Sequence, residues 1–254
     1  LSGTAVTTGI QNTLIGAETG DALTEGSRNV AVGRNALSAD TLGSRSTALG
    51  RNSLASQNFT TATDSNNVAV GYNSGASVTT GQFNTFVGSE AGDANTDASG
   101  NVAVGYAALS TNTTGEFNTA IGREALENNL SSDYNTAVGF RAGEEVTTGT
   151  ENTLIGALAG DELTDADYNV AIGTSALSAD TLGSRSVAIG YQALATQNFS
   201  TANNVYNVAI GYSAGSSITT GKNSVFIGGL AGDALTTGDR NVAIGTSALG
   251  SDTL

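Results

Sequence analysis

The sequence predicts an all-β protein, specifically a parallel β-solenoid (β-roll) built from 17-residue coils. Three observations support this. The pattern Asn-(Thr/Val)-Ala-(Val/Ile)-Gly recurs along the whole chain, and its spacing is nearly constant. The composition is also unlike that of a globular domain: charged residues are only 13% and aromatic residues 6%, yet hydrophobic residues reach 39%. We therefore expect a regular structure that buries small apolar side chains.

The spacing of the repeat sets the predicted organisation. Successive glycines at the end of the pattern are 17 residues apart, except Gly50 to Gly71 and Gly190 to Gly211, which are 21 apart. Each unit is thus one coil, and two coils carry a four-residue insertion. We predict a single continuous array of about 14 coils over residues 1–254, with the insertions within 50–71 and 190–211.

Two longer periods are superimposed on the coil period. The runs Ser38–Ser46 and Ser178–Ser186 are identical and lie 140 residues apart, as do Gly16 and Gly156. The residue four positions after each glycine also cycles through Gly and Leu over four coils. Tandem duplication explains both periods, and a structure in which each repeat contacts only its neighbours tolerates such duplication.

Each coil is predicted to contain one clear strand and one weaker strand. Val30 and Val32 lie two residues apart, so they share one face of a strand, and β-branched residues favour strands. We expect this face to point into the coil. A weaker strand is expected around the small residue three positions after the glycine, such as Ala36. The abundance of Gly and the lack of a 3.6-residue period argue against helix.

Polar residues at fixed repeat positions predict hydrogen-bonded ladders between coils. Asn opens the strand in most coils, as at Asn12 and Asn29, and tolerates the backbone angles of a turn. A Thr eight residues after the glycine, as at Thr24 and Thr41, is nearly as regular. Stacked in register, both types of residue would bond along the array.

The middle residue of each strand predicts an oligomer. It is Ala in most coils, and in every fourth coil it is a large apolar residue: Leu14, Phe86, Leu154 and Phe226. If this face points outward, the chain carries a long apolar stripe that soluble monomers rarely leave exposed. Other copies of the chain around a common axis would cover it, so we predict a homotrimer with these four residues in its interface.

No catalytic, cofactor or metal site is predicted. The chain lacks His and Cys, so the usual general base and thiol nucleophile are absent. Asp21, Asp93, Asp161 and Asp233 recur in every fourth coil; the interpretation as turn residues is favoured, with a cation on a trimer axis as the alternative. A net charge of −14 argues against binding nucleic acid, and no apolar run is long enough to insert into a membrane.

The two insertions are candidate glycan contacts. They bring an aromatic residue next to an amide, in Asn58 with Phe59 and in Asn198 with Phe199, on loops expected to protrude. The alternative is a bulge that only covers a coil edge.

The repeats resemble those of trimeric autotransporter adhesin heads. The resemblance rests on runs such as Asn29–Gly33 and Asn223–Gly228 and covers essentially the whole chain. The Thr-Thr-Gly segments at 79–81, 113–115 and 147–149 are also similar to repeats of phage tail-fibre-like proteins. The resemblance implies a left-handed coil, a homotrimer and an extracellular location. The 17-residue unit is longer than is usual in adhesin heads, so the side-by-side geometry of the chains is open.

Together these observations predict the shaft of an extracellular adhesive or tail-like fibre at a cell surface or on a virion, with no enzymatic activity. Its partners would be copies of itself and surface glycans or the surface of a host or prey cell. One alternative is a purely structural extracellular filament without a recognition role. Another is an ice-binding solenoid, which the Thr ladder favours; charged residues next to that ladder, such as Glu25 and Asp97, argue against it.

Overall fold

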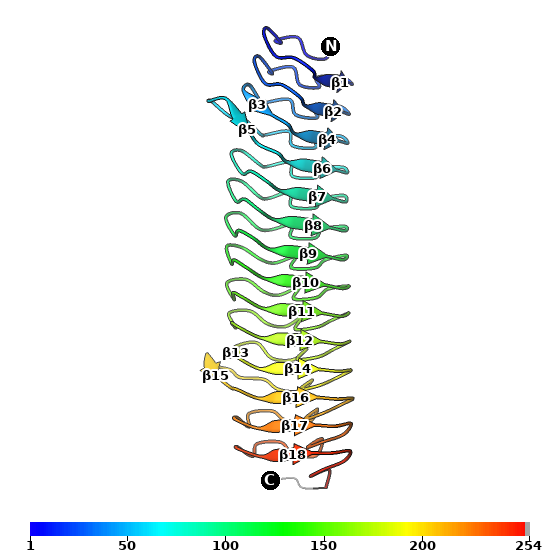
Figure 1. Cartoon of the computed structure of the whole chain (residues 1–254), viewed down its shortest axis with the longest axis vertical. Helices are drawn as coiled ribbons and strands as arrows, with labels where there is room; N and C mark the ends of the chain where they lie inside the picture. The colour runs from blue at the N-terminus through cyan, green and yellow to red at the C-terminus, as the bar shows by residue number, and fades with distance from the viewer. Residues whose placement is uncertain (252–254) are drawn as a thin grey trace. The chain divides into compact units, whose positions relative to one another are not determined.

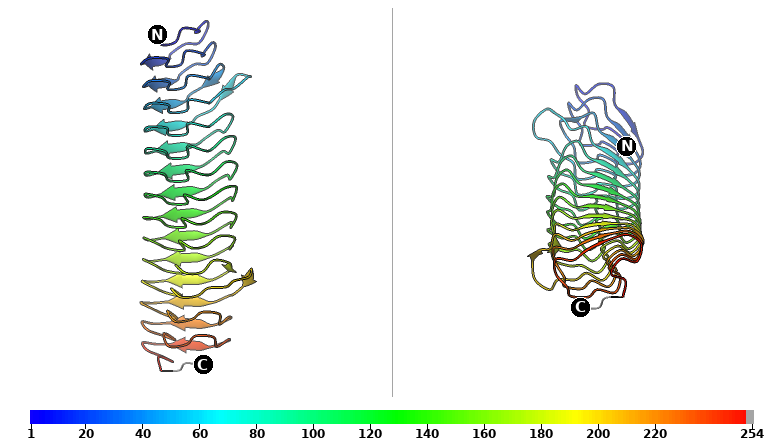
Figure 2. Two further views of the ribbon diagram at one scale, coloured as in Figure 1. Left: turned by 180° about the vertical axis from the view of Figure 1, so that it is seen from behind. Right: turned by 60° about the horizontal axis from the view of Figure 1, so that its bottom comes forward.

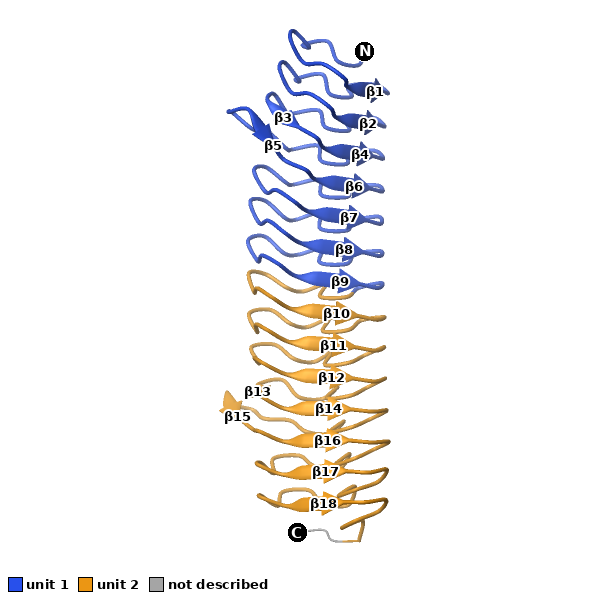
Figure 3. Cartoon of the chain, viewed as in Figure 1, with its two compact units in different colours: residues 1–124 blue, residues 125–254 orange. Residues whose placement is uncertain are grey.

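The structure, a computed structural model, describes residues 1–251 and contains only strands and turns in that range. The chain divides into two compact units, residues 1–124 and residues 125–254 (Figure 3). In each unit, stacked coils about 17 residues apart contribute one short strand each to a parallel sheet (Figure 1). The predicted all-β parallel solenoid of about 14 coils is confirmed. The single continuous array over 1–254, the handedness and the trimer stay predictions.

The strands of each sheet are three residues long. In the first unit they are β1 (Thr13–Ile15), β2 (Val30–Val32), β4 (Thr47–Leu49), β6 (Val68–Val70), β7 (Thr85–Val87), β8 (Val102–Val104) and β9 (Thr119–Ile121). In the second unit they are β10 (Thr136–Val138), β11 (Thr153–Ile155), β12 (Val170–Ile172), β14 (Val187–Ile189), β16 (Val208–Ile210), β17 (Val225–Ile227) and β18 (Val242–Ile244).

The insertions leave the register of the main sheets unchanged. Residues at equivalent repeat positions pair across neighbouring coils, and Leu49 still pairs with Val70 across the 21-residue interval. The segments that carry the insertions instead add separate two-stranded parallel sheets with the coil before them: β5 (Thr63–Asp64) pairs with β3 (Gly43–Ser44), and β15 (Asn203–Asn204) pairs with β13 (Gly183–Ser184). The segments at β5 and β15 bulge from the outline of the neighbouring coils (Figures 1 and 2).

The predicted orientation of the main strands is wrong. The middle residue of each strand points into the coil: Ala31, Ala48 and Ala103 are fully buried. The flanking residues point outward, and Val30 is 37% exposed. A three-residue strand has only one position left for the inner face when both ends face outward. The period of two was correct, but β-branched residues favour the strand on either face and so could not show which face is buried.

The large residues in every fourth coil are part of the interior, so their predicted place in an interface between chains is also wrong. Phe86, Leu154 and Phe226 are fully buried, and Leu14 in the first coil is half-buried. Glycines make room for them: a Cβ on Gly75 would lie 2.8 Å from the Phe86 ring, and one on Gly92 would lie 2.5 Å from it. The four-coil cycle of the middle strand residue and the four-coil cycle of Gly and Leu after the strand therefore have one cause: Gly occurs where a large side chain needs room.

The predicted second strand is a turn. Asn35 and Leu37, on either side of Ala36, both have positive φ angles, 58° and 52°, which no strand accommodates. The small residue between them is fully buried, as the expected narrow interior requires. Backbone bonds still join successive coils here; the Gly20 N–H donates to the carbonyl of Ala36 at 3.0 Å.

The glycine that ends each strand is required by both conformation and close approach. These glycines have φ between 118° and 144°, a region open almost only to Gly. A Cβ on Gly88 would lie 2.2 Å from the carbonyl oxygen of Gly105 in the next coil. The stacking distance of the coils therefore depends on a column without side chains.

We predict that Gly88→Ala destabilises the protein by roughly 2–6 kcal/mol, the combined cost of a strained backbone and an overpacked contact. Gly229→Ala is the matched control, since nothing lies within 4 Å of its Cβ position, and it should change stability by at most about 1 kcal/mol. Thermal unfolding followed by circular dichroism measures both. Equal melting temperatures for the two variants would contradict this account of the glycine column.

The predicted Asn ladder is confirmed. The N–H of Asn29 donates to Oδ1 of Asn12 at 2.9 Å, and Nδ2 of Asn29 donates to the carbonyl of Gly43 at 2.9 Å. The second unit has the same arrangement at Asn169. Oδ1 of Asn29 accepts from the N–H of Ser46 at 2.8 Å, so both polar atoms of the buried side chain bond to the next coil. Burying the amide therefore carries little cost. The Thr hydroxyls form a second ladder; that of Thr24 donates to the carbonyl of Thr41 at 3.0 Å.

Asn95 is a buried polar residue outside these ladders. It is fully buried, and neither Oδ1 nor Nδ2 forms a hydrogen bond within the part of the chain that the structure describes. The equivalent residue 140 positions later is Leu235, which is 1% exposed. The same interior therefore accepts an aliphatic side chain at this position.

We predict that Asn95→Leu stabilises the protein by about 1–3 kcal/mol, because an unpaired buried amide is removed. Asn112→Leu in the next coil should instead destabilise it, since Asn112 exchanges two hydrogen bonds of 3.0 Å with the backbone of Gly115. Denaturant titration of both variants tests the difference. Destabilisation by both changes would show that Asn95 has partners in solution.

Candidate functional site

The outer sheet face is the first candidate surface. We use this name for the two outward ranks of each sheet, which are the first and third residues of every main strand. The third residue is always Val, Ile or Leu, and the first is Val or Thr. Exposure stays substantial away from the two chain ends, for example 39% at Ile121 and 37% at Ile155 and Ile210. The outer sheet face thus combines an aliphatic rank of Val, Ile and Leu with a mixed rank of Val and Thr.

Aromatic and cationic residues flank this face at two repeat positions, one directly after the strand-ending glycine and one five residues before it. Tyr191 stacks on Tyr212 in the coil that follows, with ring centroids 5.4 Å apart. The guanidinium of Arg51 lies 5.7 Å from the Tyr72 ring, and that of Arg185 lies 4.5 Å from the Tyr168 ring. An aliphatic centre bordered by Tyr, Phe and Arg matches the composition of protein interfaces.

The insertion loops do not present the aromatic side chains that the sequence predicted. Phe59 and Phe199 are each only 4% exposed, whereas Asn58 and Asn198 are exposed. The prediction is therefore wrong for the two Phe residues, which cover the widened coil because an aromatic ring gains more from burial than from solvent contact. The ammonium of Lys222 lies 5.2 Å from the centre of the Phe199 ring. A glycan contact by the two Asn residues stays a prediction.

Each insertion is held by a buried carboxylate that the sequence reasoning missed. Asp40 is fully buried; its Oδ2 accepts from Gln57 Nε2 at 2.6 Å, and its Oδ1 accepts from the N–H groups of Gly43 and Phe59 at 3.0 and 3.2 Å. Gln57 in turn accepts from Asn67 at 2.9 Å, which links the loop to the Asn ladder. Asp180 repeats these contacts with Gln197, Gly183 and Phe199. The identical sequence run that includes Asp40 and Asp180 was the available signal.

The chemistry of these carboxylates is structural. Burial raises the pKa of Asp40 and of Asp180, and the hydrogen bonds from Gln57 and Gln197 oppose that rise. All the donors around each group come from its own coil and the next one, so the side chain is enclosed and cannot reach a substrate. A role in proton transfer at the surface is therefore excluded for this pair.

The recurring Asp residues lie half-buried at the turn. Burial raises the pKa of Asp93 and of Asp161 to about 6, with a smaller contribution from Glu90 and from Glu162 respectively. Oδ1 of each is buried and has no hydrogen-bond partner among the described residues, and the same holds for Asp233. Within one chain these residues are four coils apart, so they do not form one site. The favoured interpretation as turn residues therefore stays a prediction, with a cation on a trimer axis as its alternative.

These two carboxylates predict a pH dependence of stability. A folded pKa near 6 against 3.8 for the free group means that the folded state binds more protons, so stability falls as pH rises through 6 and is recovered as pH falls. We expect Asp93→Ser with Asp161→Ser, which installs the residue of the next coil, to raise the melting temperature at pH 7 and to reduce its change between pH 7 and 5. Parallel melting curves of parent and variant across that range would refute this.

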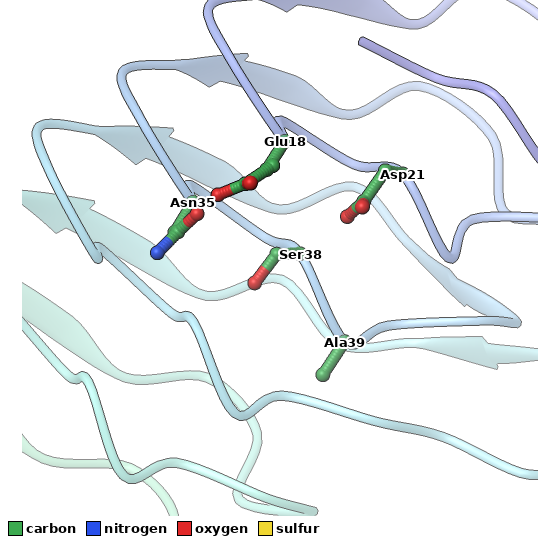
Figure 4. A pocket seen from close by; sticks show the side chains of 5 residues that line it. All are labelled: Glu18, Asp21, Asn35, Ser38 and Ala39. Carbon is green, nitrogen blue, oxygen red and sulfur yellow. The ribbon is translucent and has the colours of Figure 1, made fainter. Parts of the chain in front are cut away.

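A shallow polar depression lies on the first unit. Glu18, Asp21, Asn35, Ser38 and Ala39 line it, from two successive coils (Figure 4). Nε of Arg34 lies 3.7 Å from the Glu18 carboxylate, and both side chains are more than half exposed. Acids in such a solvated position keep a surface soluble and show no feature of a catalytic pair.

Comparison with known proteins agrees with this picture. The family model described as the YadA head domain repeat matches two segments, residues 42–63 and 182–203. Both segments contain an insertion and its anchoring Gln. No match was found among curated proteins or among solved structures. Over the part of the chain that the structure describes, no helix is long and apolar enough to cross a membrane. The matched segments thus resemble the head repeats of trimeric autotransporter adhesins, a structural rather than an enzymatic family that is found at the cell surface.

Proposed function

We propose that this chain is a shaft segment of an extracellular adhesive fibre in which copies of the chain associate through their outer sheet faces. The observation that carries the proposal is the exposed ladder of Val, Ile and Thr on every coil. Its role is to hold a binding surface away from a cell or a virion. We assign it no enzymatic activity.

The geometry of the outer sheet face favours a second copy as its partner. A surface that repeats with every coil is matched best by a surface with the same repeat distance. Another copy of the same chain has that repeat distance. Covering the two outward ranks would remove the apolar area of their Val, Ile, Leu and Thr side chains from water, at about 25 cal/mol per Å². The gain per coil is small, but it is repeated along each unit.

Three copies around one axis cover this face with equivalent contacts. Each chain has one flat sheet face, and the flanking Tyr, Phe and Arg residues would lie at the edges where neighbouring chains meet. The homotrimer is thus supported by a face in each sheet and by the head repeats that the insertions resemble. The proposed interface residues are the outward Val, Ile, Leu and Thr, in place of the inward-pointing Leu14, Phe86, Leu154 and Phe226.

The assembly is tested by light scattering of the purified chain. The parent should have the mass of a trimer, and Ile172→Lys with Ile189→Lys should reduce it to a monomer while circular dichroism retains the β signal, because these side chains are half-exposed on neighbouring coils. Glu145→Lys with Glu162→Lys is the control; it adds two lysines at turn positions outside the outer sheet face and should remain trimeric. A monomeric parent, or a trimer that survives the Ile substitutions, would refute the proposed interface.

A further inference from the structure

A second polar pocket lies beside the insertion of the second unit. Three successive coils line it with Asp165, Asp167, Ser184, Ala202, Asn203 and Asn204. Its volume is about 280 Å³, which is large enough for one sugar ring. Asn203 and Asn204 form β15, so the inserted segment itself builds one wall.

The carboxylates of this pocket are fixed by their neighbours. Oδ1 of Asp165 accepts from the Thr148 hydroxyl at 2.7 Å. Oδ1 of Asp167 accepts from the N–H of Thr150 at 2.8 Å, and the N–H of Asp167 donates to the buried Ser184 hydroxyl at 2.9 Å. Side chains that are already positioned lose little entropy when a ligand binds.

The amides are fixed as well, by the two cations of this region. Lys222 Nζ donates to Oδ1 of Asn203 at 2.8 Å, and Arg185 Nε donates to Oδ1 of Asn204 at 2.9 Å. Asn203 Nδ2 is used by the carbonyl of Thr201 at 2.8 Å. Within the described part of the chain, Oδ2 of Asp165, Oδ2 of Asp167 and Nδ2 of Asn204 form no hydrogen bond. Two acceptors and one donor thus remain available to a ligand.

Exposed aromatic residues are near the pocket residues in sequence, and Tyr168 shares its contact residue Arg185 with Asn204 of the pocket. Tyr168 directly follows Asp167 and is 43% exposed, and its ring is covered on one side by Arg185, the residue that holds Asn204. Tyr206, two residues after β15, is 52% exposed. An aromatic face beside fixed acceptors and a donor fits the alternating apolar and hydroxyl surfaces of a sugar.

The equivalent position in the first unit has the same buried residues but different exposed residues. The residues from Ala36 to Ser46 are identical to those from Ala176 to Ser186, and the buried anchors at 57 and 197 are both Gln. Four of the five polar wall residues differ, and so does the nearby aromatic residue. Glu25, Ser27, Thr63, Asp64 and Arg28 replace Asp165, Asp167, Asn203, Asn204 and Tyr168, whereas Ser44 matches Ser184. In the first unit Arg45 meets Asp64 at 3.2 Å, so an ion pair replaces the amide contact. The change is confined to the surface and keeps the fold.

We propose that this pocket of the second unit binds an uncharged carbohydrate, whose hydroxyls donate to Asp165 and Asp167 and accept from Asn204. Sialylated or otherwise acidic glycans are disfavoured by the two carboxylates. A divalent cation fits less well, because one oxygen of each carboxylate is already bonded and Ca²⁺ requires six to eight oxygen ligands. The proposal names a ligand class for the adhesive function proposed above and rests on that function.

The test uses the whole chain on an array of neutral and sialylated oligosaccharides, followed by calorimetry with the strongest neutral binder. The parent should bind one neutral glycan per chain. The variant Asp165→Glu, Asp167→Ser, Asn203→Thr and Asn204→Asp, which carries the residues of the first unit, should lose at least ten-fold in affinity. It should fold normally, because the first unit already folds with those residues.

The reciprocal variant separates specific recognition from surface stickiness. Glu25→Asp, Ser27→Asp, Thr63→Asn and Asp64→Asn, combined with Arg28→Tyr, should raise the stoichiometry from one glycan to two per chain. Absence of neutral glycan binding by the parent, or unchanged binding by the first variant, would overturn the proposal. Heat released by CaCl₂ without any glycan signal would also overturn it, in favour of a cation site. Light scattering of the same samples reports the assembly independently, so failure of the glycan site and failure of the fibre are distinguished.

Discussion

The close stacking of the coils at the strand-ending glycines is the constraint on which the other features depend. At successive glycines such as Gly88 and Gly105, the carbonyl of the later one occupies the space that a Cβ of the earlier one would need. This contact leaves a narrow interior that accepts one inward residue per strand and, at the following turn of most coils, an Ala with a Leu or Gly beside it. It also brings the Asn side chains close enough to bond from coil to coil. Backbone packing therefore determines which side chains the interior can hold.

The sequence predicted the architecture well and the orientation of its strands poorly. Repeat spacing alone defined the coils, the insertions and the Asn ladder, since these depend on counting. The choice of inner face could not be made by counting. The apolar character of Val and Ile suggested that they face the interior, but the interior is too narrow for two ranks of such side chains. The Gly and Leu cycle four residues after the glycine contained the correction, because Gly occurs where Phe86 and Phe226 need room.

The candidate sites show the same limit. An aromatic residue in an insertion predicted a surface contact, yet Phe59 and Phe199 are buried and the polar residues around them form the accessible wall. The pocket of the second unit joins residues from three coils, so no single sequence window contains it. The sequence did contain one signal of the pocket. The two segments 140 residues apart keep the same buried residues but differ in the exposed residues that line the pocket.

The alternation of large and small interior residues has a consequence for how the chain can change length. Phe86 requires Gly75 in the coil before it and Gly92 in its own coil. A large interior residue therefore needs Gly in two successive coils. Loss or gain of one coil would place a large side chain against a Leu and leave a void elsewhere. Recombination that shifts the chain by a whole four-coil cycle restores every layer to its partner. Chains with this interior can therefore lengthen or shorten only by whole sets of four coils.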